Sequence, residues 1–119
     1  MTETQNPKKY DLEERTFEFA KRVRAFVKNL SKTVGNIEDG KQVVRSSGSQ
    51  AANYIEANEA LSKKDFIMRV KISRKETKES ELWLKLCEIN DTMENERQQL
   101  LQEALELRKI FGSIIEKSK

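Results

Sequence analysis

Two rows of cationic side chains are the residues in this sequence best suited to chemistry. The members of each row follow one another at three, four or seven residues, so they fall on one side of a predicted helix. The first basic row is Lys21, Arg24, Lys28 and Lys32, and the second basic row is Lys64, Lys71, Lys75, Lys78 and Lys85. Cations in ordered rows are typical of surfaces that contact the phosphates of RNA or DNA. Each row alone also fits an ordinary solvated helix face whose lysines keep the protein soluble.

Three glutamates, Glu56, Glu76 and Glu79, are the carboxylates that could support acid–base chemistry. The chain has no histidine and one cysteine, which excludes Ser-His-Asp and Cys-His catalysis, a Glu-x-x-His di-iron site and a Cys/His zinc site. A hydrolase that uses the glutamates stays an alternative, but glutamates that face Asn53 and serines are more typical of a structural hydrogen-bond network. We therefore expect no enzyme, no metal, no cofactor and no small-molecule substrate.

Composition predicts an all-α protein with one domain. The chain has 119 residues, one proline, four glycines and 36% charged residues, which suits one core built from helices. No apolar run approaches the roughly 20 residues of a membrane span, and the lone Cys87 indicates a reducing, cytoplasmic location. The net charge is only +3, so a nucleic-acid hypothesis depends on where the charge lies.

Hydrophobic periodicity and capping residues predict four helices. After a flexible tail at residues 1–10, the bundle of residues 11–119 is expected to have helices at about 12–31, 38–61, 63–90 and 93–117. The expected caps are Asp11 for the first helix, Asn36 or Asp39 for the second, Ser62 for the third, and Asp91 or Thr92 for the fourth. Short connections place neighbouring helices antiparallel, which predicts an antiparallel up-down-up-down four-helix bundle.

The second and third predicted helices each have a further face suited to burial. On the second helix, a row of small or amide-bearing residues lies opposite the apolar face: Gln42, Ser46, Ser49, Asn53, Glu56 and Ala60. Gly48 fits a helix packed on both sides, because glycine inside a helix costs about 1 kcal/mol relative to alanine and close packing usually compensates. On the third helix, a stripe beside the core face contains Met68, Ile72, Glu76, Glu79, Trp83 and Leu86. A bundle helix of a monomer normally has one apolar stripe, so these faces predict a homo-oligomer with Trp83 in or next to its interface.

A polar network is expected between these two helices. Asn53, Glu56, Glu76 and Glu79 lie on facing stripes of helices that a short turn connects. Hydrogen bonds among them, or to Arg45, Ser46 and Ser49, would fix the register of the two helices.

Several segments together resemble the signature of a known family. The residues are Gln42, Arg45, Ser46, Ser47, Ser49, Asn53, Glu56, Ala57, Ala60, Ser62, Lys63, Lys64, Phe66, Lys75, Glu76, Glu79, Trp83 and Leu84, and residues 12–30 resemble the family's first helix. The family is that of four-helix-bundle proteins first described as encoded within intervening sequences of bacterial large-subunit ribosomal RNA genes. The resemblance implies a ring-like homopentamer of up-down-up-down bundles. It also implies kinship with the accessory variability determinant of diversity-generating retroelements, a basic pentameric bundle that binds nucleic acid and a reverse transcriptase.

Two functions stay open at this point. The first is a non-enzymatic, oligomeric nucleic-acid-binding or scaffold protein, with RNA or DNA as its partner and, by the resemblance, a reverse transcriptase. The second is a protein-interaction or assembly module without nucleic-acid binding. A ring repeats each basic row in every subunit, which favours the first function, whereas the modest net charge favours the second.

Overall fold

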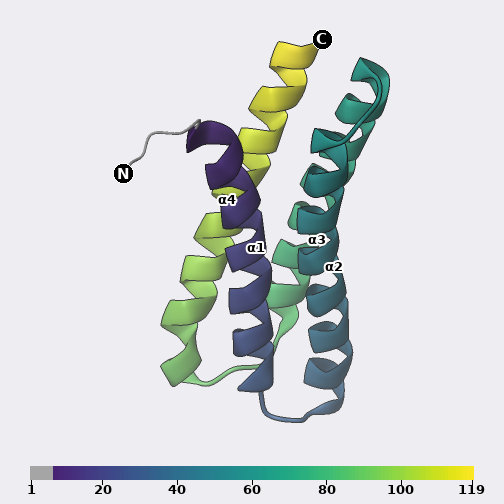
Figure 1. Cartoon of the computed structure of the whole chain (residues 1–119). Helices are drawn as coiled ribbons and strands as arrows, with labels where there is room; N and C mark the ends of the chain where they lie inside the picture. Colours follow the sequence, from purple (N-terminus) through teal and green to yellow (C-terminus); the bar gives the residue numbers. More distant parts are fainter. Residues whose placement is uncertain (1–6) are drawn as a thin grey trace.

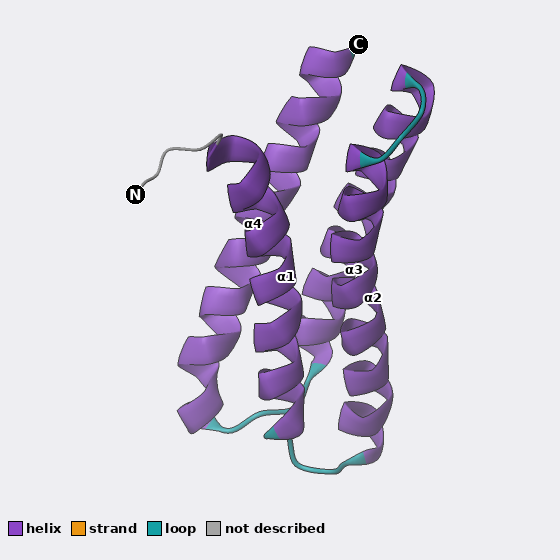
Figure 2. Cartoon of the chain, viewed as in Figure 1, coloured by secondary structure: helices purple, strands orange, loops and turns teal. Residues whose placement is uncertain are grey.

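The computed structural model describes residues 7–119 as four helices with short connections (Figure 1). The helices are α1 (Pro7–Lys28), α2 (Val34–Asn58), α3 (Lys63–Leu86) and α4 (Asp91–Ser118). The connections after α1 and after α3 lie at one end of the molecule, and the connection after α2 lies at the other (Figure 2). Residues 7–119 contain no strand, which confirms the all-α, four-helix prediction. Over the same residues, every helix is too short or too polar to cross a membrane.

The core runs along the inside of the bundle and draws on all four helices. Its largest fully buried side chains include Phe19 from α1, Val43 from α2, Leu84 from α3 and Phe111 from α4. The Phe111 ring lies tilted against Tyr54 of α2, with the two ring centroids 5.9 Å apart. Phe19, Leu84 and Phe111 lie on the apolar faces that helical periodicity predicts. On α2 the prediction holds only in part, because Val43 is buried whereas Ile55, which was assigned to the apolar face, is 49% exposed.

The first helix begins earlier than predicted. Residues 7–10, assigned to the tail, belong to α1, and Asp11 lies inside the helix rather than at its cap. Proline is favoured at the first position of a helix because its missing N–H has no intrahelical partner there. Pro7 can therefore start α1, whereas residues 1–6 of the predicted tail lie outside the described residues.

Two of the remaining caps differ from the predictions. Thr33 caps α2, and its side chain accepts a hydrogen bond from the Asn36 N–H at 3.1 Å. Asn90 caps α4 and accepts a hydrogen bond from the Thr92 N–H at 3.0 Å. The cap predicted for the third helix is confirmed, because Ser62 accepts from the Asp65 N–H at 3.0 Å. Every cap found is an Asn, Ser or Thr whose side-chain oxygen satisfies a free N–H of the first turn.

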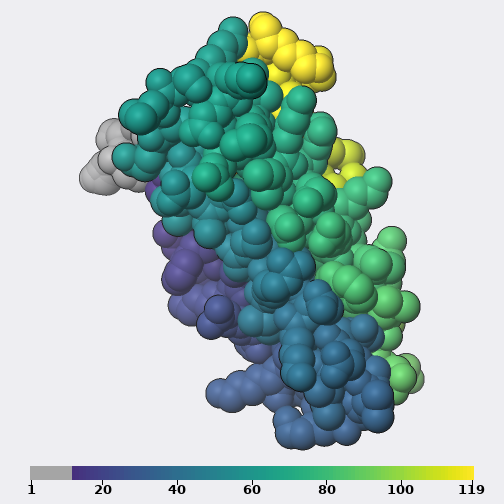
Figure 3. Space-filling model, turned by 90° about the vertical axis from the view of Figure 1, so that its right-hand side faces the viewer, coloured from purple at the N-terminus to yellow at the C-terminus, as the bar shows by residue number. Residues whose placement is uncertain are grey.

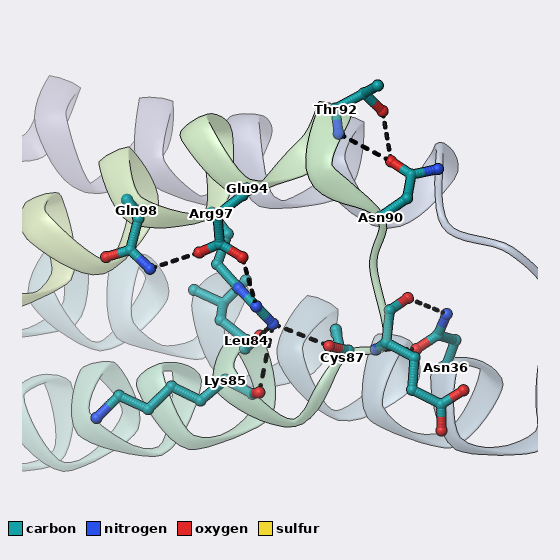
Figure 4. Close-up of polar contacts among 10 residues, drawn as sticks. Asn36, Leu84, Lys85, Cys87, Asn90, Thr92, Glu94, Arg97 and Gln98 are labelled. Atoms are coloured by element: carbon teal, nitrogen blue, oxygen red, sulfur yellow. Dashed lines mark hydrogen bonds and ion pairs between the residues drawn. The ribbon is translucent and has the colours of Figure 1, made fainter.

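Asn36, which was predicted as a possible cap, lies inside α2 and joins the two connections at one end of the bundle. Its side chain is 3% exposed. Its Nδ2 donates to the carbonyl oxygens of Ser31 at 3.0 Å and Glu88 at 2.9 Å, and its Oδ1 accepts from the Glu88 N–H at 2.7 Å. Figure 4 shows the Asn36 side chain facing the connection between α3 and α4.

Arg97 closes the C-terminus of α3 from the side of α4 (Figure 4). Its Nη1 donates to the carbonyl oxygen of Cys87 at 2.9 Å and lies 3.4 Å from those of Leu84 and Lys85. Its Nη2 donates to Glu94 Oε1 at 2.7 Å. The last carbonyls of a helix have no intrahelical donor, and an arginine is a suitable partner for them. The third helix therefore ends at Leu86, four residues before the predicted end.

Asn36→Ala should lower the free energy of unfolding by about 1–3 kcal/mol, because it removes the three hydrogen bonds by which the buried Asn36 side chain holds the backbone of Ser31 and Glu88. Urea denaturation followed by far-UV circular dichroism measures the change. Asn29→Ala is the matched control: Asn29 is exposed and donates only to the Ala25 carbonyl of its own helix. The control should stay within about 0.5 kcal/mol of the parent. Equal losses in the two variants would contradict the role given to Asn36.

Candidate nucleic-acid interface

All nine side chains of the two basic rows are exposed. The first basic row lies on α1 except for Lys32, which follows the helix, and the second lies entirely on α3. Across residues 12–119, none of the nine forms an ion pair within 4.0 Å of a carboxylate. The Nζ of Lys21 instead lies 5.7 Å from the centroid of the Phe17 ring. Their charges are therefore available to an anionic partner.

Three arginines form ion pairs between α4 and a neighbouring helix. Arg15 of α1 donates through Nε and Nη2 to Glu103 at 3.1 and 2.8 Å, and this hydrogen bonding raises the pKa of Arg15. Arg22 lies 3.7 Å from Glu96. Arg108 of α4 makes a two-pronged ion pair with Glu81 of α3. Within residues 12–119, the cations of α1 that form no ion pair are Lys21, Arg24 and Lys28.

The first basic row borders a groove between α1 and α2. At one end, Lys32 lies with Lys41 and Arg45 of α2 around a hollow of about 460 Å³ whose floor includes Val27 and Val44. Further along, a second hollow of about 400 Å³ is lined by Phe17, Ala20, Lys21, Arg24, Gly48, Ala51, Ala52 and Ile55. Lys41 and Arg45 are exposed and were not predicted as binding residues. Their spacing of four residues was a visible signal, but their position across from the first basic row depends on how the helices pack.

The second basic row shares its face of α3 with apolar side chains. Met68, Leu82 and Leu86 are each about half exposed. Lys71 follows Met68 by three residues and Leu82 follows Lys75 by seven, so lysines and apolar side chains alternate on one side of the helix. This face therefore offers charge and apolar surface together.

The small-residue row of α2 packs on α3 of the same chain. Ser46 Oγ and Ser80 Oγ are 2.7 Å apart, and Ser73 Oγ donates to the Gln50 carbonyl oxygen at 2.9 Å. Figure 3 shows the two helices side by side along one face of the molecule, with α2 in blue to teal and α3 in teal to green. Within the row, Ser46 is buried on α3 and Glu56 is exposed, so the predicted second buried face of α2 is present only in part. The outer members of the row, Gln42, Ser49 and Asn53, are half-buried.

The predicted polar network between α2 and α3 forms only in part. Asn53 Nδ2 donates to Ser49 at its carbonyl oxygen (3.0 Å) and its Oγ (3.1 Å), as expected. Asn53 Oδ1, however, accepts from Arg69 Nη1 at 3.0 Å, a partner that was not predicted. Glu56 is exposed and Glu79 is half-buried. Among residues 12–119, no hydrogen bond joins Asn53 to either glutamate or to Glu76, so that part of the prediction was wrong. The long Arg69 side chain reaches Asn53 in their place.

Two buried polar atoms of α3 have no hydrogen-bond partner. They are Glu76 Oε1 and Trp83 Nε1. Glu76 is 8% exposed, and Trp83 is half-buried with its indole packed against the core. The two residues are seven apart, so they lie on the same side of the helix. A buried polar group without a partner is rare and destabilising, which makes this strip of α3 a candidate contact surface.

Cys87 and the carboxylates do not assemble into a reactive centre. Burial raises the pKa of the Cys87 thiol to about 11, so the nucleophilic thiolate is scarce at neutral pH. In the described part of the chain, no three His, Cys, Asp or Glu side chains gather closely enough to hold a metal ion. The side chains that stand ready for a ligand are therefore the unpaired cations.

Sequence comparison identifies the family to which these features belong. Residues 8–113 match the model of the 23S rRNA-intervening sequence protein family. The chain belongs to this family. The resemblance seen in the sequence is thereby confirmed as far as the intervening-sequence family, and the kinship with the retroelement determinant stays a prediction.

A solved structure provides a second comparison for this member of the 23S rRNA-intervening sequence family. It is the crystal structure, at 1.70 Å resolution, of a protein with unknown function from the S23 ribosomal protein family of Bacteroides thetaiotaomicron. The two chains are 31% identical, the match covers 92% of this chain and 98% of the other, and the TM-score is 0.78. No curated protein matches the chain. The family and the fold are therefore shown, and the function has to be argued from the surface of this member.

Proposed function

We propose that this member of the 23S rRNA-intervening sequence family is a non-enzymatic, oligomeric nucleic-acid-binding or scaffold protein. The observation that supports it best is the first basic row, whose cations are exposed and form no ion pair within residues 12–119. Lys32 of this row shares a hollow with Lys41 and Arg45 of α2, and Lys21 and Arg24 line the second hollow of the α1–α2 groove. Phosphate contacts supply most of the affinity of non-specific nucleic-acid binding. The arginines on the side of α4 are neutralised within the chain, so the positive charge is concentrated where a polyanion can reach it.

Binding by these cations should not depend on base sequence. Phosphate contacts fix position but carry little sequence information. RNA and DNA are therefore both candidate ligands, and the protein is expected to work in the cytoplasm without a membrane partner or a small-molecule substrate. The resemblance further supports a reverse transcriptase as protein partner, for which this member would be an accessory factor.

The assembly that we propose is a ring-like homopentamer of antiparallel up-down-up-down bundles. Within the single chain, Glu76 Oε1 and Trp83 Nε1 are buried without partners, and half-exposed Met68 and Leu86 lie near them on α3. The chain itself encloses both atoms, so a neighbouring subunit would cover the half-exposed apolar side chains and the exposed part of the Trp83 ring. A ring also repeats the basic rows, so that weak phosphate contacts add through multivalency.

Trp83→Phe should weaken self-association, because it shortens a half-buried side chain whose exposed part we assign to a subunit contact. Sedimentation equilibrium at micromolar concentration should show a homo-oligomer for the parent and a shift towards the 13.9 kDa chain for the variant. Leu61→Ala, at the exposed turn between α2 and α3, is the control and should leave the distribution unchanged. A parent protein that sediments as a single chain would contradict the proposed assembly.

A second function, a protein-interaction module, is favoured by the apolar side chains Met68, Leu82 and Leu86 on α3. Fluorescence anisotropy distinguishes the two functions. Labelled single-stranded RNA, single-stranded DNA and duplex DNA of equal length are titrated with protein at about 50 mM salt, where phosphate contacts are strong. Saturable binding of at least one of them is expected. Absence of binding to all three would overturn the nucleic-acid function and leave the interaction module.

A further inference from the structure

Gly48 occupies a position in α2 that the chain's own packing does not explain. A Cβ atom built there meets no other atom within 4 Å. At Gly40, by contrast, a Cβ would lie 3.0 Å from Val27 Cγ1 of α1, so that glycine allows the two helices to approach. Glycine weakens a helix interior relative to alanine. The close packing that was expected at Gly48 is absent within the chain, which indicates space kept for something else.

The space beside Gly48 is the hollow of about 400 Å³ in the α1–α2 groove. Phe17 stands at its edge with 53% of its surface exposed, and Ile55 is 49% exposed. The Nζ of Lys21 lies 5.7 Å from the Phe17 ring centroid, within the range of a cation–π contact. Three alanines complete the lining, and because their side chains are short they leave the hollow open. An exposed aromatic ring, a smooth apolar wall and flanking cations therefore occur together.

We propose that this hollow receives an unpaired nucleobase of a single-stranded nucleic acid, stacked on Phe17, while the strand's phosphates follow the first basic row. The inference rests on the proposed function and specifies its ligand. Proteins that bind single strands combine a cationic track with aromatic rings on which bases stack. The base faces of a duplex are covered by neighbouring bases, so a duplex can use the cations but not the ring.

The dimensions of the groove agree with this ligand. Lys21 and Lys28 are seven residues apart on α1, which corresponds to about 10 Å at the rise of an α-helix, and Lys32 follows beyond the end of the helix. Several cations can therefore lie along a strand that starts at Phe17. The rim next to Phe17 contains Lys21 and Arg24 and no acidic side chain. A polyanion is therefore the complementary occupant. A segment of another protein or a second copy of the chain is the competing occupant that the experiment must exclude.

The test compares three single variants with the parent chain. Phe17→Leu removes the ring, Gly48→Leu fills the hollow from the side of α2, and Gly48→Ala is its matched control, with one added carbon. A Cβ atom at Gly48 meets no atom of the chain within 4 Å, the hollow has room for the longer leucine side chain, and both residues favour a helix more than glycine does. Melting temperatures should therefore not fall. Anisotropy titrations use a single-stranded uridine oligonucleotide and a duplex of equal length.

Phe17→Leu and Gly48→Leu should each weaken single-strand binding by roughly 5- to 150-fold, the effect of losing one stacked base. Duplex binding and the dependence of affinity on salt should stay as in the parent, because the cations are untouched. Gly48→Ala should lose much less than Gly48→Leu. A base analogue placed in the oligonucleotide, 2-aminopurine, should lose fluorescence on binding to the parent but not to Phe17→Leu.

The results that overturn the inference differ from those that overturn the function. If the parent binds single strands but both variants bind them equally well, the cations bind nucleic acid and the stacking site is wrong. If Phe17→Leu changes the sedimentation of the protein and not its affinity for single strands, the hollow is an interface between copies. If the parent binds neither oligonucleotide, the proposed function itself has failed.

Discussion

Phe111→Ala should lower the free energy of unfolding by about 3–5 kcal/mol, the usual loss for a large aromatic side chain removed from a core. Phe111 has 0% of its surface exposed and packs against Tyr54 with ring centroids 5.9 Å apart. It belongs to α4 and Tyr54 to α2, so the truncation opens a cavity where two helices far apart in the sequence meet. The surrounding side chains come from rigid helices and can close it only in part.

Urea denaturation measures this loss, with Phe17→Ala as the matched control. The two variants make the same chemical change, but Phe17 is 53% exposed. Much of the Phe17 ring is in water in the folded chain, so its removal should cost a small fraction of the Phe111 value. A control that is destabilised as strongly as Phe111→Ala would mean that the assignment of the core is wrong.

The double variant Lys71→Glu with Lys75→Glu should weaken binding to single-stranded nucleic acid by about tenfold or more and reduce the log–log salt slope by about 1.4, since two phosphate contacts are lost. Both lysines are exposed on α3, and each change also places a negative charge next to the phosphates. Anisotropy titrations at several salt concentrations give the affinity and the slope together.

The control for this variant is a second double variant that makes the same change in net charge on a different helix. Lys109→Glu with Lys117→Glu alters two exposed lysines of α4 that belong to neither basic row. Because Met68 and Leu82 lie among the lysines of α3, both double variants are also run in sedimentation equilibrium. If the two double variants lose affinity equally, only the total charge matters and the second basic row has no binding role. If only the α3 variant changes its assembly, its loss of affinity reports an interface.

Much of the fold was predictable because helix burial follows local spacing. Apolar residues at three- and four-residue intervals identified the buried sides of the helices, and Phe19, Val70 and Leu107 are all fully buried. Ser62 was found as a cap because a cap and its third neighbour are local in sequence. The role of Asn36 was not predictable in this way. Its partner Glu88 is 52 residues away in the sequence. In the local sequence, an asparagine next to a glycine is typical of the end of a helix.

The candidate site was predictable as a set of residues but not as a surface. Lys21 and Arg24 are exposed as their spacing indicated. Their position next to Gly48 depends on the packing of α1 on α2, which no single helix reveals. The polar network failed for a similar reason. Arg69 was outside the expected set, yet its length lets it reach Asn53 from the facing helix.

The salt dependence of single-strand RNA binding by the parent chain tests the central claim most directly. If the four cations of the first basic row each contact a phosphate, the logarithm of the association constant should fall with the logarithm of salt concentration at a slope of about −2.8, or about −0.7 per contact. A slope of that size or steeper, measured between about 50 and 200 mM salt, is the result that we predict. Affinity that does not change with salt, or no binding at the lowest salt concentration, would contradict a function based on these cations.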